Sequence, residues 1–375
     1  MPEHDAILFI AASETDSNLF YACRFLAGDP FVYTQIGDEK ILLMSDLELG
    51  RARDESKVDT VLSYSRYEGL AKNAGVTTPQ ATDVLHVLFQ EQGVKRLLVP
   101  TSFGIAHGDR LRDLGYEIKC KPEPFIEERV VKSDEEIAHI TESQRQTERA
   151  VQKAIDAIRE AKPRKDFLYI NGEVLTAEKL KHILNVSLME AGCVARHTIV
   201  APGAQGADPH NQGTGPIRPN ESIVMDVFPQ SSHTRYWADM TRTVVRGKAS
   251  DRLKAMYEAV HAAQEVCFSR LKAGANGAEL HTEVQKTLSD AGFLTEERNG
   301  KMVGYFHGTG HGLGLDIHEP PRIGKGGKDL PENTVVTVEP GLYYPEHGAV
   351  RIEDLVVVTA DGYRSLTEFP KYLEI

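Results

Sequence analysis

Three strand-like segments of this chain each place a carboxylate among apolar residues, and this pattern restricts the fold more than any other feature. The acids are Asp226 in SIVMDVF, Glu339 in VVTVEP and Glu353 in VRIEDLVVV. Burying an unpaired carboxylate costs several kcal/mol, which is a large share of the roughly 5–15 kcal/mol that stabilises a folded domain. Each acid alone can instead lie on a half-exposed strand or form an ordinary salt bridge. Taken together, they predict that the fold gathers them around a cation.

A fourth acid, Asp239, lies in RYWADMTRT, which we expect to pair with SIVMDVF as a hairpin across PQSSH. In that hairpin Asp226 and Asp239 would face each other across the Ser232–His233 turn. Two carboxylates so close repel unless they share a positive charge. With a histidine and two more acids from later strands, four negative charges would balance two divalent cations. Oxygen-rich ligation favours Mn²⁺, Co²⁺ or Fe²⁺, and a metal pair about 3.5 Å apart would hold and deprotonate a water.

The stretch HGTGHGLGLDIHE, in the last quarter of the chain, is rich in both histidine and glycine. Each interior glycine would cost a helix about 1 kcal/mol, so we expect an extended chain here. In an extended chain His307 and His311 share a face, whereas His318 joins them only if the chain bends. Gly312 and Gly314 are suited to such a bend. The alternative is a glycine-rich loop in which the histidines are incidental.

Length and composition indicate two domains and exclude several classes of partner. A chain of 375 residues, 41% hydrophobic and 26% charged, is typical of a soluble protein with more than one core. A net charge of −12 argues against a nucleic-acid or anionic-membrane surface. The first apolar run is too short to span a membrane and lacks the basic flank of a signal peptide. Four widely spaced cysteines without a CxxC pair are expected to be buried thiols in a reducing cytoplasm.

The first part of the chain alternates strand-like and helix-like segments, which predicts a small α/β domain. It ends near KCKPEPFIEE, and a new helix begins at SDEEIAHI, where Ser133 caps the helix and Glu136 completes a capping box. We therefore divide the chain into domains of residues 1–128 and 129–375. The expected strands are residues 6–11, 31–36, 40–45 and 96–102, and the expected helices are residues 17–28 and 82–93.

The second part contains a candidate internal repeat. TAEKLKHILNVSLMEAG, ending at Gly192, resembles NGAELHTEVQKTLSDAG, ending at Gly292. A long helical segment precedes each copy, and strand-like sequence follows each. A helix closed by glycine is common, so the similarity has weight mainly because of this shared context. A true repeat implies a pseudo-symmetric domain of two helix-helix-sheet units with a cleft between them.

These motifs, in this order, resemble the pita-bread family of metallopeptidases, which includes prolidase, aminopeptidase P, methionine aminopeptidase and the metal-free creatinase. The matching motifs are an Asp within a strand, D-x-TRT, HGTGHGLGLDIHE, VEPGLY and RIED. The first domain resembles the creatinase/prolidase N-terminal domain, and VVKSDEEI resembles the start of the family's linking helix. The resemblance implies an α/β N-terminal domain, an α+β pita-bread catalytic domain with a pseudo-twofold internal repeat, and a homodimer.

The resemblance also implies a pair of divalent metal ions, with Mn²⁺ favoured and Co²⁺, Fe²⁺ or Zn²⁺ as alternatives. Glu339 would in addition shuttle a proton. The hairpin between the first two ligands is two residues longer than the family's usual spacing, and an even insertion preserves the face on which both aspartates lie. The implied metal ligands are Asp226, Asp239, His311, Glu339 and Glu353.

A further group of residues is implied to act on the substrate. His307 and His318 would hydrogen-bond the substrate and the reaction intermediate, and Arg351 would stabilise the ligand carboxylates. His210, in ADPHNQG, would line the substrate site. Arg322, in HEPPRIG, would pair with the C-terminal carboxylate of a dipeptide, a contact for which a planar guanidinium is well suited.

The implied activity is hydrolysis of Xaa-Pro bonds in small peptides, with dipeptides favoured. A metal-bridging hydroxide would attack the carbonyl that precedes proline, and the metals would stabilise the oxyanion. The N-terminal domain argues against methionine aminopeptidase, and the complete ligand set argues against creatinase. Two alternatives stay open: an aminopeptidase P that acts on longer Xaa-Pro peptides, and a non-catalytic pita-bread protein that binds a peptide or a partner.

Overall fold

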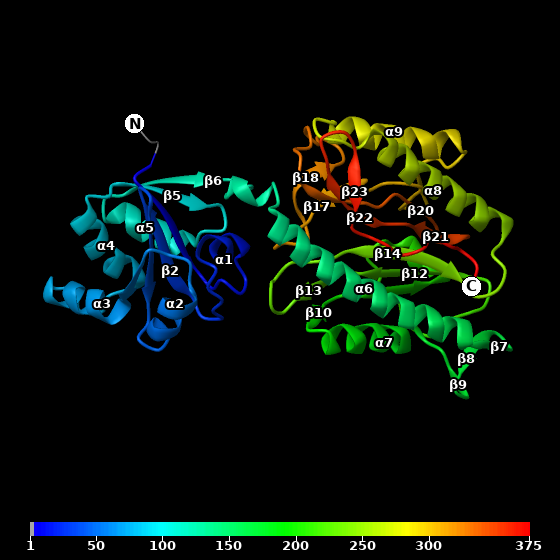
Figure 1. Ribbon diagram of the computed structural model, residues 1–375, viewed down its shortest axis with the longest axis horizontal. Coiled ribbons are helices and arrows are strands. Elements are labelled where there is room, and N and C mark those ends of the chain that lie inside the picture. Colours follow the sequence, from blue (N-terminus) through cyan, green and yellow to red (C-terminus); the bar gives the residue numbers. More distant parts are fainter. Residues whose placement is uncertain (1–3) are drawn as a thin grey trace. The chain divides into compact units, whose positions relative to one another are not determined.

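The computed structural model describes residues 4–375, and the chain divides into two compact units. The first unit ends at Glu127 and the second spans Glu128–Ile375 (Figure 1). None of the helices in residues 4–375 combines the length and the apolar character that a membrane span requires.

The first unit contains a six-stranded mixed sheet and five α-helices, which confirms the expected α/β architecture. Its strands are β1 (Ala6–Ala11), β2 (Phe31–Ile36), β3 (Glu39–Met44), β4 (Thr60–Ser63), β5 (Arg96–Pro100) and β6 (Glu117–Lys121). Its helices are α1 (Ser17–Cys23), α2 (Leu49–Glu55), α3 (Tyr64–Asn73), α4 (Ala81–Gln92) and α5 (Ile105–Asp113). The strand order is β4-β3-β2-β1-β5-β6. Alternate side chains of β1 enter different cores, with Leu8 in one and Phe9 in the other.

Two sequence expectations for this unit were wrong in detail. Helix α1 ends at Cys23, whereas we expected it to continue to residue 28. It stops because Arg24 adopts a left-handed conformation with φ of 53°, from which the helix cannot continue. Cys120, on the edge strand β6, is exposed and is not a buried thiol.

The second unit has two long helices, each followed by a shorter one: α6 (Asp134–Glu160) and α7 (Ala177–Glu190), then α8 (Asp251–Arg270) and α9 (Gly277–Asp290). The capping box of Ser133 and Glu136 begins α6, as predicted. Helices α7 and α9 each have 14 residues. The glycines that follow them, Gly192 and Gly292, have φ of 70° and 81°. The pseudo-twofold repeat is therefore a feature of the fold.

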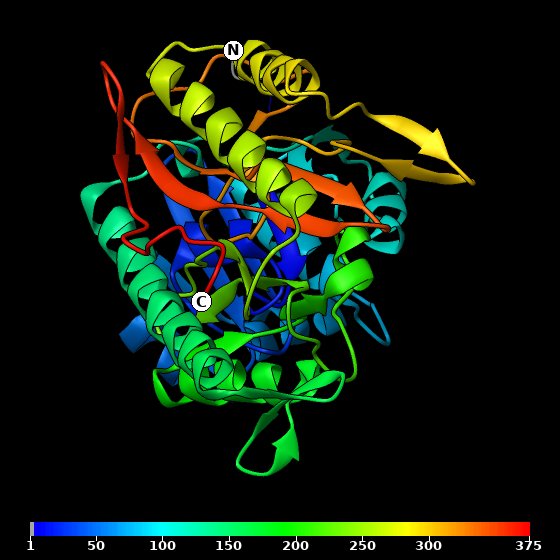
Figure 2. The ribbon, with the colours of Figure 1, turned by 90° about the vertical axis from the view of Figure 1, so that its right-hand side faces the viewer.

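Strands fill the space between the two helix pairs, which lie on opposite sides of the unit (Figure 1, Figure 2). One core packs α6 and α7 against the first half-sheet, and a second core packs α8 and α9 against the other. The first half-sheet has the order β11 (Ile199–Pro202), β12 (Ser222–Val227), β14 (Met240–Val245). The second has the order β18 (Glu319–Ile323), β17 (Gly310–Gly312), β19 (Val335–Val338), β22 (Asp354–Val358), β23 (Tyr363–Ser365).

Smaller elements complete the second unit. Strand β10 (Cys193–Ala195) pairs with β13 (Pro229–Ser231), and β20 (Gly341–Tyr344) pairs with β21 (Gly348–Arg351). The hairpin of β15 (Glu296–Arg298) and β16 (Lys301–Val303) projects from the unit (Figure 2). The remaining strands of this unit are β7 (Lys162–Arg164), β8 (Phe167–Ile170) and β9 (Glu173–Val174), and it also contains the short 3-10 helix η2 (Gly203–Ala207). A second 3-10 helix, η1 (Glu127–Arg129), lies at the boundary of the two units.

A buried arginine joins the two halves where β14 meets the start of β22. Arg242 donates from Nη1 to the Glu353 carbonyl and from Nη2 to Asp354 Oδ1, both at 2.7 Å. Lys371 also pairs with Asp354, at 2.7 Å from Oδ2. Only 2% of Arg242 and 4% of Asp354 are exposed, so water competes little for these bonds.

Replacing this arginine should weaken the junction. Arg242→Met removes the donors from buried acceptors, and we expect the free energy of unfolding to fall by about 3 kcal/mol in urea titrations. As a control, Lys153→Ala breaks the surface pair with Glu190. This substitution should change the free energy of unfolding by less than about 1 kcal/mol. An equally small effect of Arg242→Met would contradict the junction role.

Candidate metal centre

The hairpin that carries two candidate ligands has a register different from the predicted one. Asp226 of β12 pairs with Thr241 of β14, whereas we expected it to face Asp239. The register is therefore shifted by two residues. Because the shift is even, both aspartates remain on one face of the ribbon.

The shift has its origin in the turn. Ser231 Oγ accepts hydrogen bonds from the backbone N–H groups of His233 and Thr234, at 3.3 and 3.2 Å. Arg235 takes a left-handed conformation with φ of 68°, and the Tyr236 carbonyl accepts from the Ser231 N–H at 3.1 Å. These bonds centre the turn one residue later than the predicted Ser232–His233.

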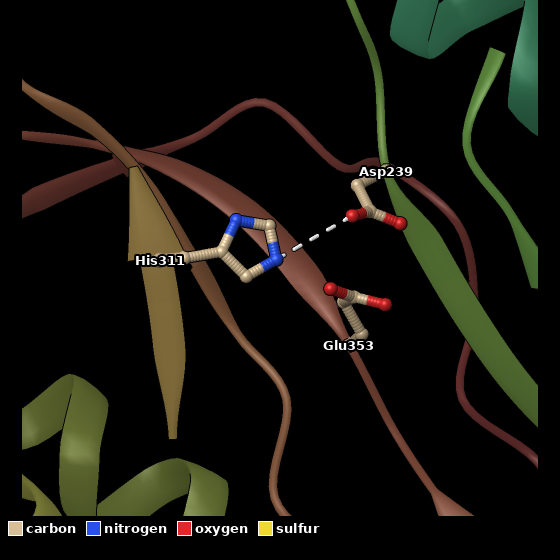
Figure 3. A group of neighbouring side chains, drawn as sticks. All are labelled: Asp239, His311 and Glu353. Atoms are coloured by element: carbon tan, nitrogen blue, oxygen red, sulfur yellow. Dashed lines mark ion pairs between the residues drawn. The ribbon is translucent and has the colours of Figure 1, made fainter. Parts of the chain in front are cut away.

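Asp239, His311 and Glu353 offer ligand atoms that all lie within 4.8 Å of one another (Figure 3). His311 Nε2 lies 3.7 Å from Asp239 Oδ2 and 3.5 Å from Glu339 Oε1. The four residues come from different strands: Asp239 directly precedes β14, His311 lies in β17, Glu339 follows β19 and Glu353 precedes β22. Both halves of the unit therefore contribute to the cluster.

Arg351 connects the fifth candidate, Asp226, to this cluster. Its Nη2 donates to Asp226 Oδ2 at 2.7 Å, and its Nε donates to Thr241 Oγ1 at 3.1 Å. The Thr241 hydroxyl in turn donates to Glu353 Oε2 at 2.7 Å. The sequence had not indicated Thr241, although it belongs to the TRT motif.

Burial dominates the electrostatics of the acids. It raises the pKa of Glu339 to about 8 and raises the pKa values of Asp239 and Glu353 well above their ordinary range. Neighbouring carboxylates raise all three further, and the Arg351 guanidinium lowers them. The protein supplies too little positive charge to keep these carboxylates ionised.

The donor set fits a divalent cation. Oδ1 of Asp226 and Oδ1 of Asp239 are buried and accept no hydrogen bond within residues 4–375. His311 donates from Nδ1 to the Gly312 carbonyl at 3.1 Å, which leaves the Nε2 lone pair on the side of the acids. Burial lowers the pKa of His311 to about 3, so its imidazole is neutral. Buried carboxylate oxygens with unmet bonds and a neutral imidazole are typical ligands of Mn²⁺ and related metals.

Glycines allow the histidine-bearing segment to lie against its neighbours. A Cβ on Gly310 would lie 1.8 Å from the Thr337 carbonyl oxygen, and one on Gly312 would lie 2.4 Å from the Pro320 oxygen. The segment is not helical, and its centre is extended in β17, as predicted; the chain then bends, beginning with a register shift after His311. The bend brings His318 back to His311, with ring centroids 4.3 Å apart. The glycines are thus needed for close backbone approach and not for a left-handed conformation.

His307 lies at the end of a hydrogen-bonded chain that includes Tyr343, which the sequence had not indicated. Arg351 Nη1 donates to Tyr343 Oη at 3.0 Å, and this hydroxyl lies 2.7 Å from His307 Nε2. His307 Nδ1 lies 2.7 Å from the Gly308 carbonyl oxygen, which can only accept. Nε2 therefore accepts from Tyr343, and burial, which lowers the pKa of His307 to about 3, keeps the ring neutral. Tyr343 had no sequence signal beyond its place in VEPGLYY.

The remaining substrate candidates are exposed and lie within electrostatic range of one another. Arg322 pairs with His311 across β17 and β18, so both side chains lie on one face. The surrounding protein removes part of the solvent from the exposed His318 ring, and this partial desolvation, then the charge of Arg322 and then that of His210, lower its pKa. His210 also contributes to the lowered pKa of His307. Arg322 and His210 are thus each close enough to His318 to lower its pKa, and all three side chains are exposed.

Two fully buried glutamines hold the backbone next to the candidate ligands. Gln264 of α8 donates from Nε2 to the carbonyls of Val338 and Ile352, at 2.8 and 3.3 Å, and these residues precede Glu339 and Glu353. Gln144 of α6 accepts from the Asp239 N–H at 3.2 Å. A glutamine in an amphipathic helix is usually exposed, so nothing in the sequence pattern assigns these residues to the site.

This combination of fold and buried acidic centre defines a metallopeptidase with the pita-bread fold. Residues 138–360 match metallopeptidase family M24, and the chain belongs to that family. It is 29% identical over 339 residues to an Xaa-Pro dipeptidase of Pyrococcus furiosus, covering 90% of this chain and 87% of the relative.

Solved structures share the same fold. An X-Pro aminopeptidase from Thermotoga maritima superposes with a TM-score of 0.82 at 24% identity, covering 99% of this chain and 98% of that one. An Xaa-Pro dipeptidase from Bacillus anthracis superposes with a TM-score of 0.83 at 23% identity, covering 99% and 95%.

Metal binding should stabilise the protein more as the pH rises. In the metal-free protein the folded-state pKa of Glu339, about 8, exceeds its ordinary 4.5. The stability from this protonated carboxyl is therefore fully present below a pH of about 4.5 and is lost as the pH rises to about 8. We expect Mn²⁺ added after chelation to raise Tm, and to raise it more at a pH of about 8.5 than at about 5.5.

Thermal melts with and without Mn²⁺ measure this difference directly. At a free metal concentration of about 100 times Kd, binding adds about 2.7 kcal/mol of stability. Asp239→Asn removes one buried anion and should lose most of the increment. The same increment in Asp239→Asn and the wild type would show that the metal binds elsewhere.

Proposed function

We propose that this metallopeptidase hydrolyses Xaa-Pro bonds, preferably in dipeptides, and that its buried centre holds two divalent metal ions, with Mn²⁺ favoured. The observation that carries the proposal is the convergence of four buried or half-buried carboxylates and one neutral imidazole in an M24 fold. Relatives named Xaa-Pro dipeptidase support the choice of substrate. The proposed ligands are Asp226, Asp239, His311, Glu339 and Glu353.

When bound, the metal pair would supply a Lewis acid and lower the pKa of a water molecule. Within this proposal, Glu339 accepts the proton of the attacking water and passes it to the proline nitrogen as the amide bond breaks. Its Oε2 lies 4.0 Å from Nδ1 of His307, which is itself a proposed substrate residue. Arg351 holds Asp226 and, through Thr241, Glu353 in fixed orientations.

The histidines have different tasks in this scheme. His318 is exposed and would donate a hydrogen bond to the substrate. Both ring nitrogens of His307 already have partners, so its contact with substrate would require the Tyr343 hydroxyl to turn away. His210 lies near both rings and would line the substrate site.

Cleavage before proline needs recognition of ring shape. The proline nitrogen in the scissile bond carries no hydrogen, so specificity cannot come from an N–H contact. Aminopeptidase activity on longer Xaa-Pro peptides is the second candidate, because the fold also matches an X-Pro aminopeptidase. Arg322 distinguishes the two activities, since only in a dipeptide does the residue directly after the scissile bond carry the terminal carboxylate.

Substrate preference tests the proposal directly. Ala-Pro should be cleaved at least about tenfold faster than Ala-Ala, measured as kcat/KM with Mn²⁺ present, because a pocket shaped for the pyrrolidine ring gains apolar contact. Activity should disappear with a chelator and return with Mn²⁺ or Co²⁺. Equal rates on the two dipeptides would indicate a general dipeptidase and contradict the Xaa-Pro assignment.

A second test concerns the length of the substrate. Arg322→Ala should raise KM for Ala-Pro by about tenfold or more, because it removes a charge-assisted contact to the terminal carboxylate. KM for Ala-Pro-Ala, whose carboxylate lies one residue further out, should change less. Lys325→Ala, a neighbouring exposed cation, is the matched control. A wild type that prefers the tripeptide, together with no effect of Arg322→Ala on the dipeptide, would favour the aminopeptidase alternative.

A further inference from the structure

A second group of buried charges lies outside the proposed ligand set. Lys132, Arg129 and Glu319 are only 3%, 6% and 9% exposed. Glu319 Oε1 lies 2.5 Å from Lys132 Nζ, and its Oε2 lies 2.6 Å from Arg129 Nη2. Arg129 Nη2 also contacts Asp316 Oδ2 at 2.7 Å. We refer to these four residues as the ion cluster; nothing in the proposed reaction uses their charges.

The ion cluster ties a loop of the site to the start of α6. Lys132 directly precedes Ser133, the residue that caps α6, and its Nζ also donates to the Arg129 carbonyl at 2.5 Å. The acidic members, Asp316 and Glu319, lie on either side of His318. Ionic contacts therefore hold the chain both before and after the proposed substrate residue.

The same loop is attached on its other side to the segment that leads into β14. Trp237 donates from its backbone N–H to the Gly314 carbonyl and from its indole Nε1 to the Leu315 carbonyl, both at 2.9 Å. A Cβ on Gly314 would lie 2.5 Å from Glu319 Oε1. The loop therefore packs closely against the carboxylate. Trp237 is the only tryptophan in the sequence, so its fluorescence reports on the place where this segment contacts the loop.

Stability does not explain why these charges are buried. Removing charges from water costs several kcal/mol each, and apolar residues of similar size in such places are often equally stable or more so. A satisfied buried ionic group instead selects one arrangement of the chain, because other arrangements leave a charge without a partner. In this loop the selected arrangement places the His318 ring 4.3 Å from that of His311.

We propose that the ion cluster is a positioning device for His318: Lys132 and Arg129 fix the loop through Glu319 and Asp316 so that the imidazole faces the substrate. The inference rests on the proposed function to the extent that His318 contacts the substrate. Lys132 and Glu319 touch neither substrate nor metal in this scheme, so they act only through the loop.

The test replaces the central ion pair by apolar side chains. In Lys132→Met/Glu319→Leu, Arg129 keeps its contact with Asp316. We expect Tm equal to or above that of the wild type and unchanged Mn²⁺ content. We expect kcat/KM for Ala-Pro to fall by about 10- to 100-fold, since a misplacement of about 1 Å can cost that much. Acrylamide should quench Trp237 more strongly, because the loop is less restrained.

A double-mutant cycle separates positioning from a general structural effect. If the ion cluster acts through His318, the same double replacement should reduce kcat/KM by less than about threefold in a His318→Ala background. An equal loss in both backgrounds would overturn the proposal, as would full activity of the double variant with wild-type quenching. Arg145→Met is the control, because Arg145 pairs with Glu148 and Glu368, and neither is a proposed site residue. It should leave kcat/KM and quenching unchanged.

Two further results would still allow the positioning role to be tested. If the double variant does not fold, Lys132→Gln removes the same positive charge with a smaller change in shape, and the same measurements apply. If wild-type protein does not cleave Ala-Pro, the proposed function is wrong. The positioning claim is then decided by Trp237 quenching, where unchanged quenching in the double variant overturns it.

Discussion

Repulsion between carboxylates gathered in one buried place is the constraint around which the catalytic unit is organised. Asp226, Asp239, Glu339 and Glu353 face one guanidinium, that of Arg351, and an imidazole that burial keeps neutral. The protein alone does not balance their charge, which explains why burial and mutual repulsion raise the pKa values of three of them. A fold can hold such a centre only if the surrounding backbone is fixed and a cation completes it.

Strand β14 shows how the backbone around the centre is fixed. Its alternate residues lie on opposite faces, so Thr241 and Thr243 contact Arg351 while Met240 and Val244 enter the core beneath α6 and α7. Arg242, between the two threonines, joins the strand to the start of β22. An apolar core and a buried ion pair therefore pack against the strand that carries the charged centre. They prevent the carboxylates from moving apart.

The sequence predicted those features that depend on local pattern. The acids stood out because each interrupts an apolar strand, and the helix beginning at Ser133 follows from its capping box. The predicted hairpin register was wrong by two residues. The turn is fixed by a hydrogen bond to Ser231 and by the left-handed conformation of Arg235, and composition reveals neither. Tyr343 and Gln264 were missed for another reason: the contacts of Tyr343 with His307 and of Gln264 with Val338 join residues 36 and 74 positions apart, and no periodicity marks them. Lys132 and Glu319, 187 residues apart, are the clearest case.

In the segment between His307 and Glu319, the close packing of the backbone determines where the proposed substrate residue His318 lies. Its glycines allow backbone to approach backbone where a Cβ would collide, so the chain can bend His318 back onto His311. Glycines also leave such a segment more conformational freedom than any other residue would. Close strand pairing restrains the end near His311, and charge restrains the end near His318. A glycine-rich segment that must hold one position needs buried ionic contacts. Apolar packing alone tolerates small displacements of the chain, whereas a hydrogen bond to the substrate does not.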